Sequence, residues 1–102
     1  MNYRDPIFPL QLRGLRGLLE LNQKALADMA GVSETLIYRI EKGEPLGQVK
    51  KLEQLQAALL ALGASFSFDG ESFGVVLRGP QAERLIQDWL ERRRSQMEDF
   101  RD

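Results

Sequence analysis

The side chains that could carry chemistry in this chain are carboxylates, amines, guanidinium groups and hydroxyls. The 102 residues include 15 Asp and Glu and 14 Lys and Arg, but no histidine and no cysteine. This composition removes the usual general base near neutral pH, thiol nucleophiles, disulfides, Cys/His zinc sites and histidine-ligated haem. The remaining groups do not cluster in the sequence around an evident pocket. We therefore expect no enzyme, and neither a metal nor an organic cofactor.

Charge is almost balanced along the chain. The net charge is −1 and the isoelectric point is about 5.5, which gives no global electrostatic sign of nucleic-acid binding. Residues 12–43 carry five cations against four acids, whereas residues 44–77 carry two cations against four acids. One run of like charge, Arg92–Arg94, is interpreted as a solvated face balanced by nearby acids, with phosphate binding as the alternative.

The elements that position these side chains are expected to form a single domain. The length is near the commonest domain size, and an apolar content of 43% is ordinary for a globular chain. No apolar run at the amino terminus has the length of a signal peptide, and no segment approaches the roughly 18 to 20 apolar residues that cross a bilayer. We expect a cytoplasmic protein without membrane contact.

Apolar spacing predicts a first helix over residues 8–21. Four apolar side chains recur on one of its faces: Phe8, Leu12, Leu15 and Leu19. Gly14 and Gly17 weaken this helix, and we expect them to allow the close approach of another helix rather than of a phosphate.

Two short helices are predicted next, over Gln23–Ala30 and Glu34–Lys42. Their ends are marked by Asn22 and Gly31 for the first, and by Ser33 and Gly43 for the second. The expected inner faces are Leu26, Ala27 and Ala30 in the first, and Leu36 or Ile37 together with Ile40 in the second.

The rest of the chain predicts two longer helices separated by a β-hairpin. Residues 48–62 repeat apolar side chains at helical spacing, namely Val49, Leu52, Leu55, Leu59 and Leu62, and Gly63 ends the helix. Ser65–Asp69 and Phe73–Leu77 are the expected strands, joined at Asp69 and Gly70. Residues 80–100 form the last predicted helix, with one apolar stripe: Ala82, Leu85, Ile86, Trp89, Leu90, Met97 and Phe100. The fold class is therefore mainly α, a bundle of four to five helices with a small β-hairpin and a carboxyl-terminal amphipathic helix.

The stretch from Asn22 to Gly43 resembles the helix-turn-helix of the lambda-repressor-like (Xre) transcriptional regulators. The matching features are Gln23 at the start of the first short helix, Leu26-Ala27 within it, Gly31-Val32-Ser33 at the turn, Ile37-x-x-Ile40-Glu41 in the second short helix, and Gly43 after it. The likeness continues to Gly74-Val75-Val76-Leu77-Arg78, as in a bacterial subgroup of short regulators with a strand pair after the helices. It covers residues 10–78. It implies a DNA-binding domain over 8–63 and a hairpin over 64–78 that serves dimerisation, and it leaves the helix of 80–100 outside the pattern.

The resemblance also implies roles for individual residues. The helix over residues 34–42 would lie in the major groove of double-stranded DNA, where Arg39 would bind O6 and N7 of a guanine. Gln23 would bind a phosphate, and Thr35 a thymine methyl group or a phosphate. Glu34 would either accept from cytosine N4 or only favour the helix start. The full expected DNA-binding set is Gln23, Lys24, Ser33, Glu34, Thr35, Tyr38, Arg39 and Lys42.

Two positions have competing interpretations, and a third needs a partner. Tyr38 either contacts DNA or packs against the preceding helix, and Leu36, where the family has a small or hydroxylated residue, is a candidate core residue. Glu41 lies at a helix end that disfavours an anion, so we expect it to form a buried pair with Arg16 of the first helix.

Two segments need a surface to cover them. The hairpin aromatics Phe66, Phe68 and Phe73 either fold onto the helical core or lie in a strand that pairs with its copy in a second subunit. The stripe of residues 80–100 likewise covers either its own core or a symmetric copy. Few cations lie on the recognition helix, so we expect modest affinity per monomer and a homodimer.

The sequence-based hypothesis is a sequence-specific DNA-binding transcriptional regulator, acting as a homodimeric repressor on a near-palindromic operator. One alternative is an antitoxin that represses its own operon and binds a toxin through the hairpin or the last helix. A second alternative is a protein-interaction module that has lost DNA binding.

Overall fold

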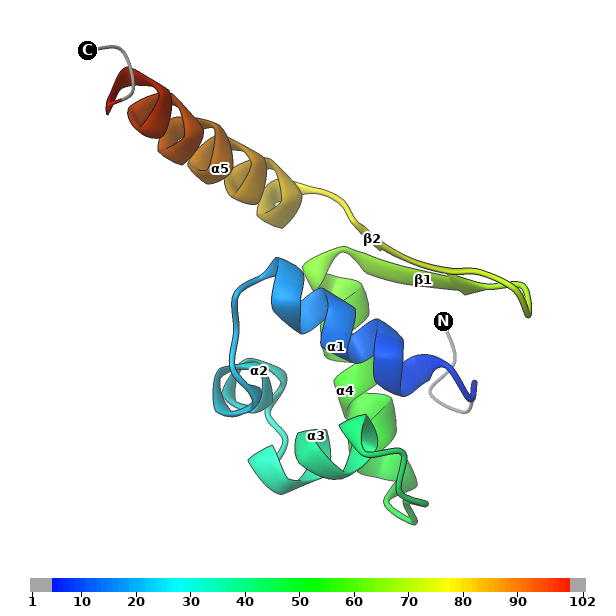
Figure 1. Cartoon of the computed structure of the whole chain (residues 1–102). Coiled ribbons are helices and arrows are strands. Elements are labelled where there is room, and N and C mark those ends of the chain that lie inside the picture. Colours follow the sequence, from blue (N-terminus) through cyan, green and yellow to red (C-terminus); the bar gives the residue numbers. More distant parts are fainter. Residues whose placement is uncertain (1–4, 100–102) are drawn as a thin grey trace.

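The computed structural model describes residues 5–99, with backbone only for residues 98 and 99 (Figure 1). Within this range the elements are α1 (Phe8–Leu18), α2 (Gln23–Ala30), α3 (Glu34–Glu41), α4 (Val49–Leu62), β1 (Ala64–Phe68), β2 (Phe73–Leu77) and α5 (Pro80–Asp99). The fold is mainly α with one two-stranded antiparallel sheet, as predicted. Among the described residues, no helix has both the length and the apolar character that a membrane span requires.

Capping residues define α2 and α3 as the sequence predicted. The Asn22 side chain accepts from the backbone N–H of Ala25 at 2.7 Å, and the Ser33 hydroxyl accepts from the N–H of Leu36 at 3.1 Å. Gly31 follows α2 with φ 71°, and Gly43 follows α3 with φ 76°. These left-handed residues let the chain turn sharply without a Cβ clash.

The first helix is shorter than the predicted range of 8–21. It ends at Leu18, because Glu20 adopts a left-handed conformation with φ 55°. The Leu21 N–H donates to the Arg16 carbonyl at 3.0 Å and the Glu20 N–H donates to the Gly17 carbonyl at 3.2 Å. The left-handed residue in such a helix-closing pattern is usually a glycine. Here it is a glutamate, so the residue type does not predict that the helix ends at this point.

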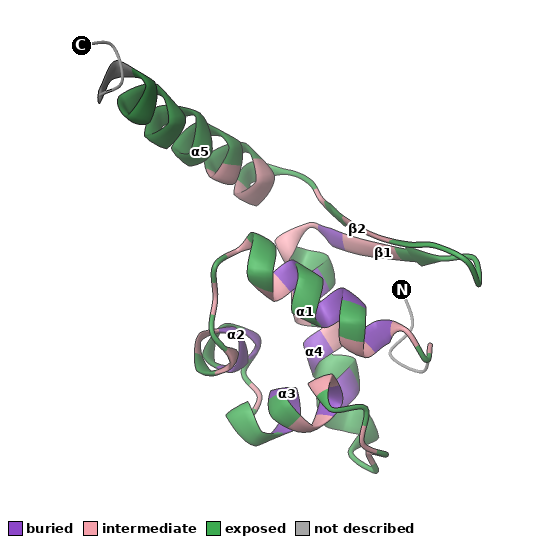
Figure 2. Cartoon of the chain, viewed as in Figure 1, coloured by how far each residue is buried: buried purple, intermediate pink, exposed green. Residues whose placement is uncertain are grey.

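The core lies where α1, α2, α3 and α4 meet (Figure 2). It contains Phe8, Leu12, Leu15, Leu26, Ala27, Ala30, Leu36, Ile37, Ile40, Leu52, Leu55, Leu59 and Ala64. Leu36 and Ile37 are both buried, so the interpretation of Leu36 as a core residue is confirmed. Val49, which was expected on the inner face of α4, is exposed; it is the first residue of the helix and lies at the edge of a hollow between α1, α3 and α4.

The hairpin folds back onto its own helical core. Phe66 of β1 packs on Phe8 of α1, with ring centroids 5.9 Å apart, and the buried amide of Gln11 donates to the Ser67 carbonyl at 2.9 Å. Phe68 and Phe73, which pair at the far end of the sheet, are exposed. The core interpretation is therefore confirmed for Phe66 alone among the three aromatics.

The two glycines of α1 differ in their surroundings. A Cβ placed on Gly14 would lie 3.4 Å from a methyl group of Val75, so a strand, rather than the predicted helix, approaches closely there. A Cβ on Gly17 would meet nothing within 4 Å. The expectation of close packing is thus wrong for Gly17, which stands on an open face of the helix.

Helix α5 projects away from the bundle (Figure 1). The radius of gyration is 15.7 Å and the longest extent is 57 Å, whereas a compact chain of this length has a radius of gyration of about 13 Å. An ion pair of 3.4 Å between two exposed side chains, Arg92 and Glu20, links α5 to the end of α1. Phe100, the last member of the predicted stripe, lies outside the described residues.

Candidate nucleic-acid interface

The outer face of α3 is fixed by what its inner face buries. Leu36, Ile37 and Ile40 all lie in the core, so the intervening positions must face outward. Glu34, Thr35 and Tyr38 are exposed, and Arg39 is partly exposed. With Ser33 capping its first turn, α3 presents these side chains from a rigid backbone.

One shallow hollow brings four of the predicted DNA-binding residues together. It is lined by Gln23 from the start of α2 and by Glu34, Thr35 and Tyr38 from α3. The remaining members of the predicted set, Lys24, Ser33, Arg39 and Lys42, do not line it. The hollow thus lies between the amino-terminal ends of the two short helices, where backbone N–H groups favour an anion.

An ion pair holds the end of α3 against α1, as the sequence predicted. The Arg16 guanidinium donates to both carboxylate oxygens of Glu41, at 2.9 and 2.8 Å, and also to the Leu21 carbonyl at 3.2 Å. The Glu41 side chain is 6% exposed. Hydrogen bonding to Glu41 raises the pKa of Arg16 above its ordinary value, although partial burial opposes this shift. A forked pair of this kind fixes orientation as well as distance.

Gln23 takes part in the same network. Its side-chain amide lies 3.5 Å from a Glu41 carboxylate oxygen and is partly buried. The position at the start of α2 agrees with a phosphate contact, since the amide has a second N–H. That role remains a prediction.

Arg39 is paired within the protein. Its Nε donates to the Glu44 carboxylate at 2.9 Å, and both side chains are 40% exposed. Glu44 was absent from the predicted set because it lies beyond Gly43, after the helix. The Glu44 N–H also donates to the Arg39 carbonyl at 3.1 Å, so the helix end itself places the carboxylate beside Arg39.

The two lysines of the predicted set also have intramolecular partners. Lys24 pairs with Asp28 one turn later at 3.0 Å, and this hydrogen bond raises the pKa of Lys24. The Lys42 ammonium lies 5.1 Å from the centre of the Tyr38 ring, and Tyr38 raises the pKa of Lys42. Both lysines are therefore cationic at neutral pH, and each already interacts with another side chain of the same chain.

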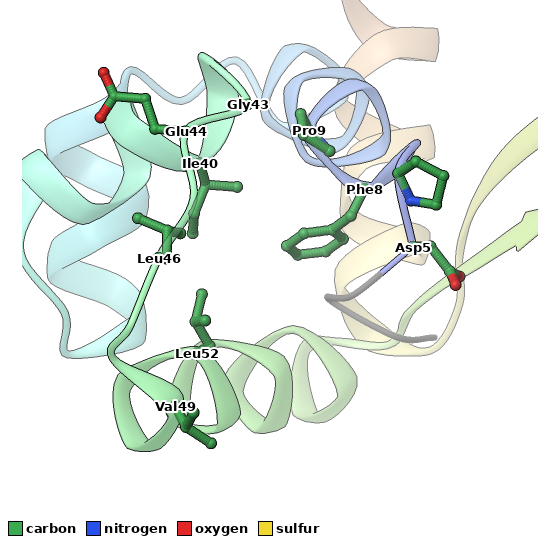
Figure 3. A pocket seen from close by; sticks show the side chains of 10 residues that line it. Asp5, Phe8, Pro9, Ile40, Gly43, Glu44, Leu46, Val49 and Leu52 are labelled. Carbon is green, nitrogen blue, oxygen red and sulfur yellow. The ribbon is translucent and has the colours of Figure 1, made fainter.

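A larger hollow of about 580 Å³ lies between the start of α1, the end of α3 and the start of α4. Figure 3 shows Phe8, Ile40 and Leu52 pointing into it, while the carboxylates of Asp5 and Glu44 point away. Neither of these two carboxylates is therefore directed into the hollow. Among the described residues, no group of three or more acidic side chains could hold a metal ion.

Comparison with known proteins identifies one feature of the chain. A family model described as helix-turn-helix matches residues 12–68, which is more than half of the sequence and extends from α1 to the end of β1. Neither the search of curated proteins nor that of solved structures found a match.

Proposed function

The chain belongs to the lambda-repressor-like (Xre) helix-turn-helix family of DNA-binding regulators, and from this premise we propose that it is a homodimeric repressor that reads a near-palindromic operator in the cytoplasm. The observation that carries the proposal is the outer face of α3. Buried Leu36, Ile37 and Ile40 hold the helix from within, and the Arg16 and Glu41 pair holds its end. A helix fixed in this way can enter the major groove without losing order.

Arg39 is the proposed base-reading residue. A guanidinium that binds O6 and N7 of guanine together discriminates by about 1 to 3 kcal/mol against the wrong base. Because Glu44 holds Arg39 at 2.9 Å in the free protein, this contact requires Arg39 to leave Glu44 or to bind guanine with the nitrogens that Glu44 does not use. The Glu44 carboxylate also repels a nearby phosphate, so it disfavours non-specific phosphate contacts of Arg39 more than a contact with the edge of an uncharged base.

The residues around the shallow hollow have complementary roles. Gln23 binds a phosphate beside the start of α2, and Thr35 contacts a thymine methyl group or a phosphate. Glu34, at the start of α3, accepts a hydrogen bond from cytosine N4 but repels nearby phosphates. It therefore raises the selectivity for cytosine rather than the overall affinity for DNA. Lys24 and Lys42 contact phosphates at the two sides of this surface, while Tyr38 packs beside them and Ser33 holds the first turn.

Two copies are needed because one copy offers few cations to the duplex. Affinity for DNA depends largely on neutralised phosphates, and a dimer doubles their number. The two copies would place their α3 helices in half-sites about 34 Å apart, one turn of the double helix. Occupation of such a site within a promoter excludes the transcription machinery, which is the repressor role we propose.

Selection of bound duplexes from a random DNA pool tests the proposal. We expect an enriched inverted repeat, with affinity that falls steeply as salt increases. Arg39→Ala should lose specific binding by about tenfold or more, which corresponds to one lost bidentate contact. Arg84→Ala, which removes the same charge from α5, serves as the matched control and should bind normally.

Enrichment of no sequence, even at low salt, would overturn the DNA-binding role. The exposed stripe of α5 would then favour the interaction-module hypothesis. Specific DNA binding together with capture of a co-encoded toxin through the hairpin or α5 would instead identify an antitoxin.

A further inference from the structure

Helix α5 carries four exposed large apolar side chains, more than any other element of the described chain. Ile86 is 55% exposed, Trp89 57% and Met97 54%, although all three lie on one side of a helix of 20 residues. In proteins most of the stability of a helix comes from packing of its apolar face rather than from intrinsic propensity. An exposed stripe of this size marks a contact surface.

We propose that α5 pairs antiparallel with α5 of a second copy of this chain, with the two-fold axis at the level of Glu91. The inference rests on the homodimer of the proposed function and names the surface that builds it. It follows from the arrangement of charge and aromatic residues along the stripe.

Arg93 selects the antiparallel orientation. The inner positions Ile86, Trp89, Arg93 and Gln96 repeat at spacings of three, four and three. In a parallel, in-register pair, each Arg93 would face its own copy across the interface, which places two cations together. In the antiparallel pair centred on Glu91, Arg93 faces Trp89 of the second copy, and Ile86 faces Gln96.

The Trp89 ring is suited to receive a guanidinium. Within one chain, Arg92 already lies 5.8 Å from the centre of this ring. Trp89 also lines a hollow with Arg93, Gln96 and Met97, so the surface of α5 is indented beside the ring. A guanidinium from a second copy placed over an indole gains a cation–π contact that strengthens as water is excluded.

Charge complementarity identifies the partner as a second copy. The part of α5 before Glu91 has a net charge of −1, and the part after it has a net charge of +1, from the three arginines Arg92–Arg94 against Glu98 and Asp99. Antiparallel pairing about Glu91 therefore places parts of opposite net charge side by side, which requires no additional protein.

The length of α5 also fits the proposed operator. Pro80 lies eleven residues before Glu91, so the two Pro80 residues of the pair would be about 33 Å apart along the helix axis at a rise of 1.5 Å per residue. Half-sites one turn apart are separated by about 34 Å. The points at which the two chains enter α5 are thus about as far apart as the two half-sites.

Single-cysteine variants of the full-length protein test this register, because the natural chain contains no cysteine. We expect Leu90→Cys, close to the axis, to form disulfide dimers with itself. Ile86→Cys alone should not, since the two copies of residue 86 would be about 15 Å apart along the axis, well beyond disulfide reach. A mixture of Ile86→Cys and Gln96→Cys should form the crossed dimer. Self-crosslinking of Ile86→Cys would show a parallel pair and overturn the proposal.

Sedimentation of uncrosslinked protein provides the second measurement. We expect the natural chain to be a dimer, and Ile86→Asp to weaken dimerisation about tenfold or more. Ser95→Asp, which adds the same charge on the opposite side of α5, is the matched control and should stay dimeric. A monomer at all concentrations, or a dimer unaffected by Ile86→Asp, would overturn the proposal.

The outcome is separable from that of the proposed function. A dimer that survives Ile86→Asp and still selects an inverted repeat overturns the α5 pairing and leaves the repressor role intact. Crosslinking in the expected register without any selected DNA supports the pairing and overturns the repressor role.

Discussion

The helices of the bundle and helix α5 each carry an apolar stripe at helical spacing, but the stripes have opposite surroundings. Leu55 and Leu59 of α4 are fully buried, whereas Trp89 of α5 is 57% exposed. Figure 2 shows buried residues within the bundle, while α5 is exposed along most of its length. Periodicity indicates that a helix will form with one apolar face, but it does not indicate what covers that face. The bundle covers its stripes within one chain. The stripe of α5 remains available for another surface, so the two regions should respond differently to mutation and to protein concentration.

The largest expected difference comes from truncating one leucine in each region. Leu55→Ala leaves a cavity in the centre of the bundle and should lower the free energy of unfolding by about 3 kcal/mol. Leu90→Ala in α5 should change the unfolding of the bundle by less than about 0.5 kcal/mol while weakening dimerisation. Urea denaturation followed by circular dichroism, at two protein concentrations, measures both. Equal losses in the two variants would mean that α5 packs on the bundle in solution.

Two glycine substitutions extend the comparison between the bundle and α5, one near the junction of the two regions and one on the open face of α1. Gly63 has φ 97°, and a Cβ there would meet the carbonyl of Arg78, the residue shortly before α5. We therefore expect Gly63→Ala to lower the free energy of unfolding by about 2 kcal/mol.

Gly17→Ala is the opposite case and the control for Gly63→Ala. Its Cβ would stand in open space on α1, so the variant should gain about 0.5 to 1 kcal/mol in stability from helix propensity. Thermal unfolding of both variants measures whether each substitution raises or lowers the stability. A loss of stability in Gly17→Ala would show that another surface covers this face of α1.

The smallest expected effect is a pH dependence at the tip of the hairpin. The Asp69 carboxylate accepts from the N–H groups of Glu71 and Ser72 at 2.9 and 2.8 Å, and these hydrogen bonds lower the pKa of Asp69 below its ordinary value of 3.8. The carboxylate is ionised more readily in the folded chain, so its stabilisation of the loop is complete above pH 3.8 and is lost as the pH falls through the lowered pKa.

NMR titration of the Glu71 and Ser72 amide signals measures this effect. Asp69→Asn should abolish the part of the titration that comes from Asp69, which is read most directly at the Ser72 amide, and leave the signals of α1–α4 unchanged. A titration midpoint above 3.8 would contradict the lowered pKa.

Short-range signals made most of the bundle predictable from sequence. Asn22 and Ser33 cap helices because their side chains bond to nearby N–H groups, and Gly31 and Gly43 end helices because they tolerate positive φ. The pair of Arg16 with Glu41 was predicted because an acid at a helix end needs a partner. Each of these inferences depends on a few neighbouring residues or on one strong electrostatic conflict.

The features that escaped prediction depend on distant or unusual contacts. Glu20 ends α1 in a left-handed conformation that favours glycine, so its residue type did not predict the end of the helix. Gln11 is buried because its amide reaches a strand carbonyl 56 residues away. The contact of Glu44 with Arg39 depends on the turn after α3, and the roles of the DNA-binding set remain predictions because they concern a molecule outside the chain.

The pairing of the cations described above has a consequence for how the protein would search DNA. Arg16, Lys24 and Arg39 are each matched by a carboxylate, Lys42 lies against an aromatic ring, and the net charge is −1. Such a surface binds weakly to DNA of arbitrary sequence, because non-specific binding depends on unpaired positive charge. We therefore expect brief stays on random DNA and short sliding distances, so that the search proceeds by repeated three-dimensional encounters and each encounter ends quickly unless the bases match.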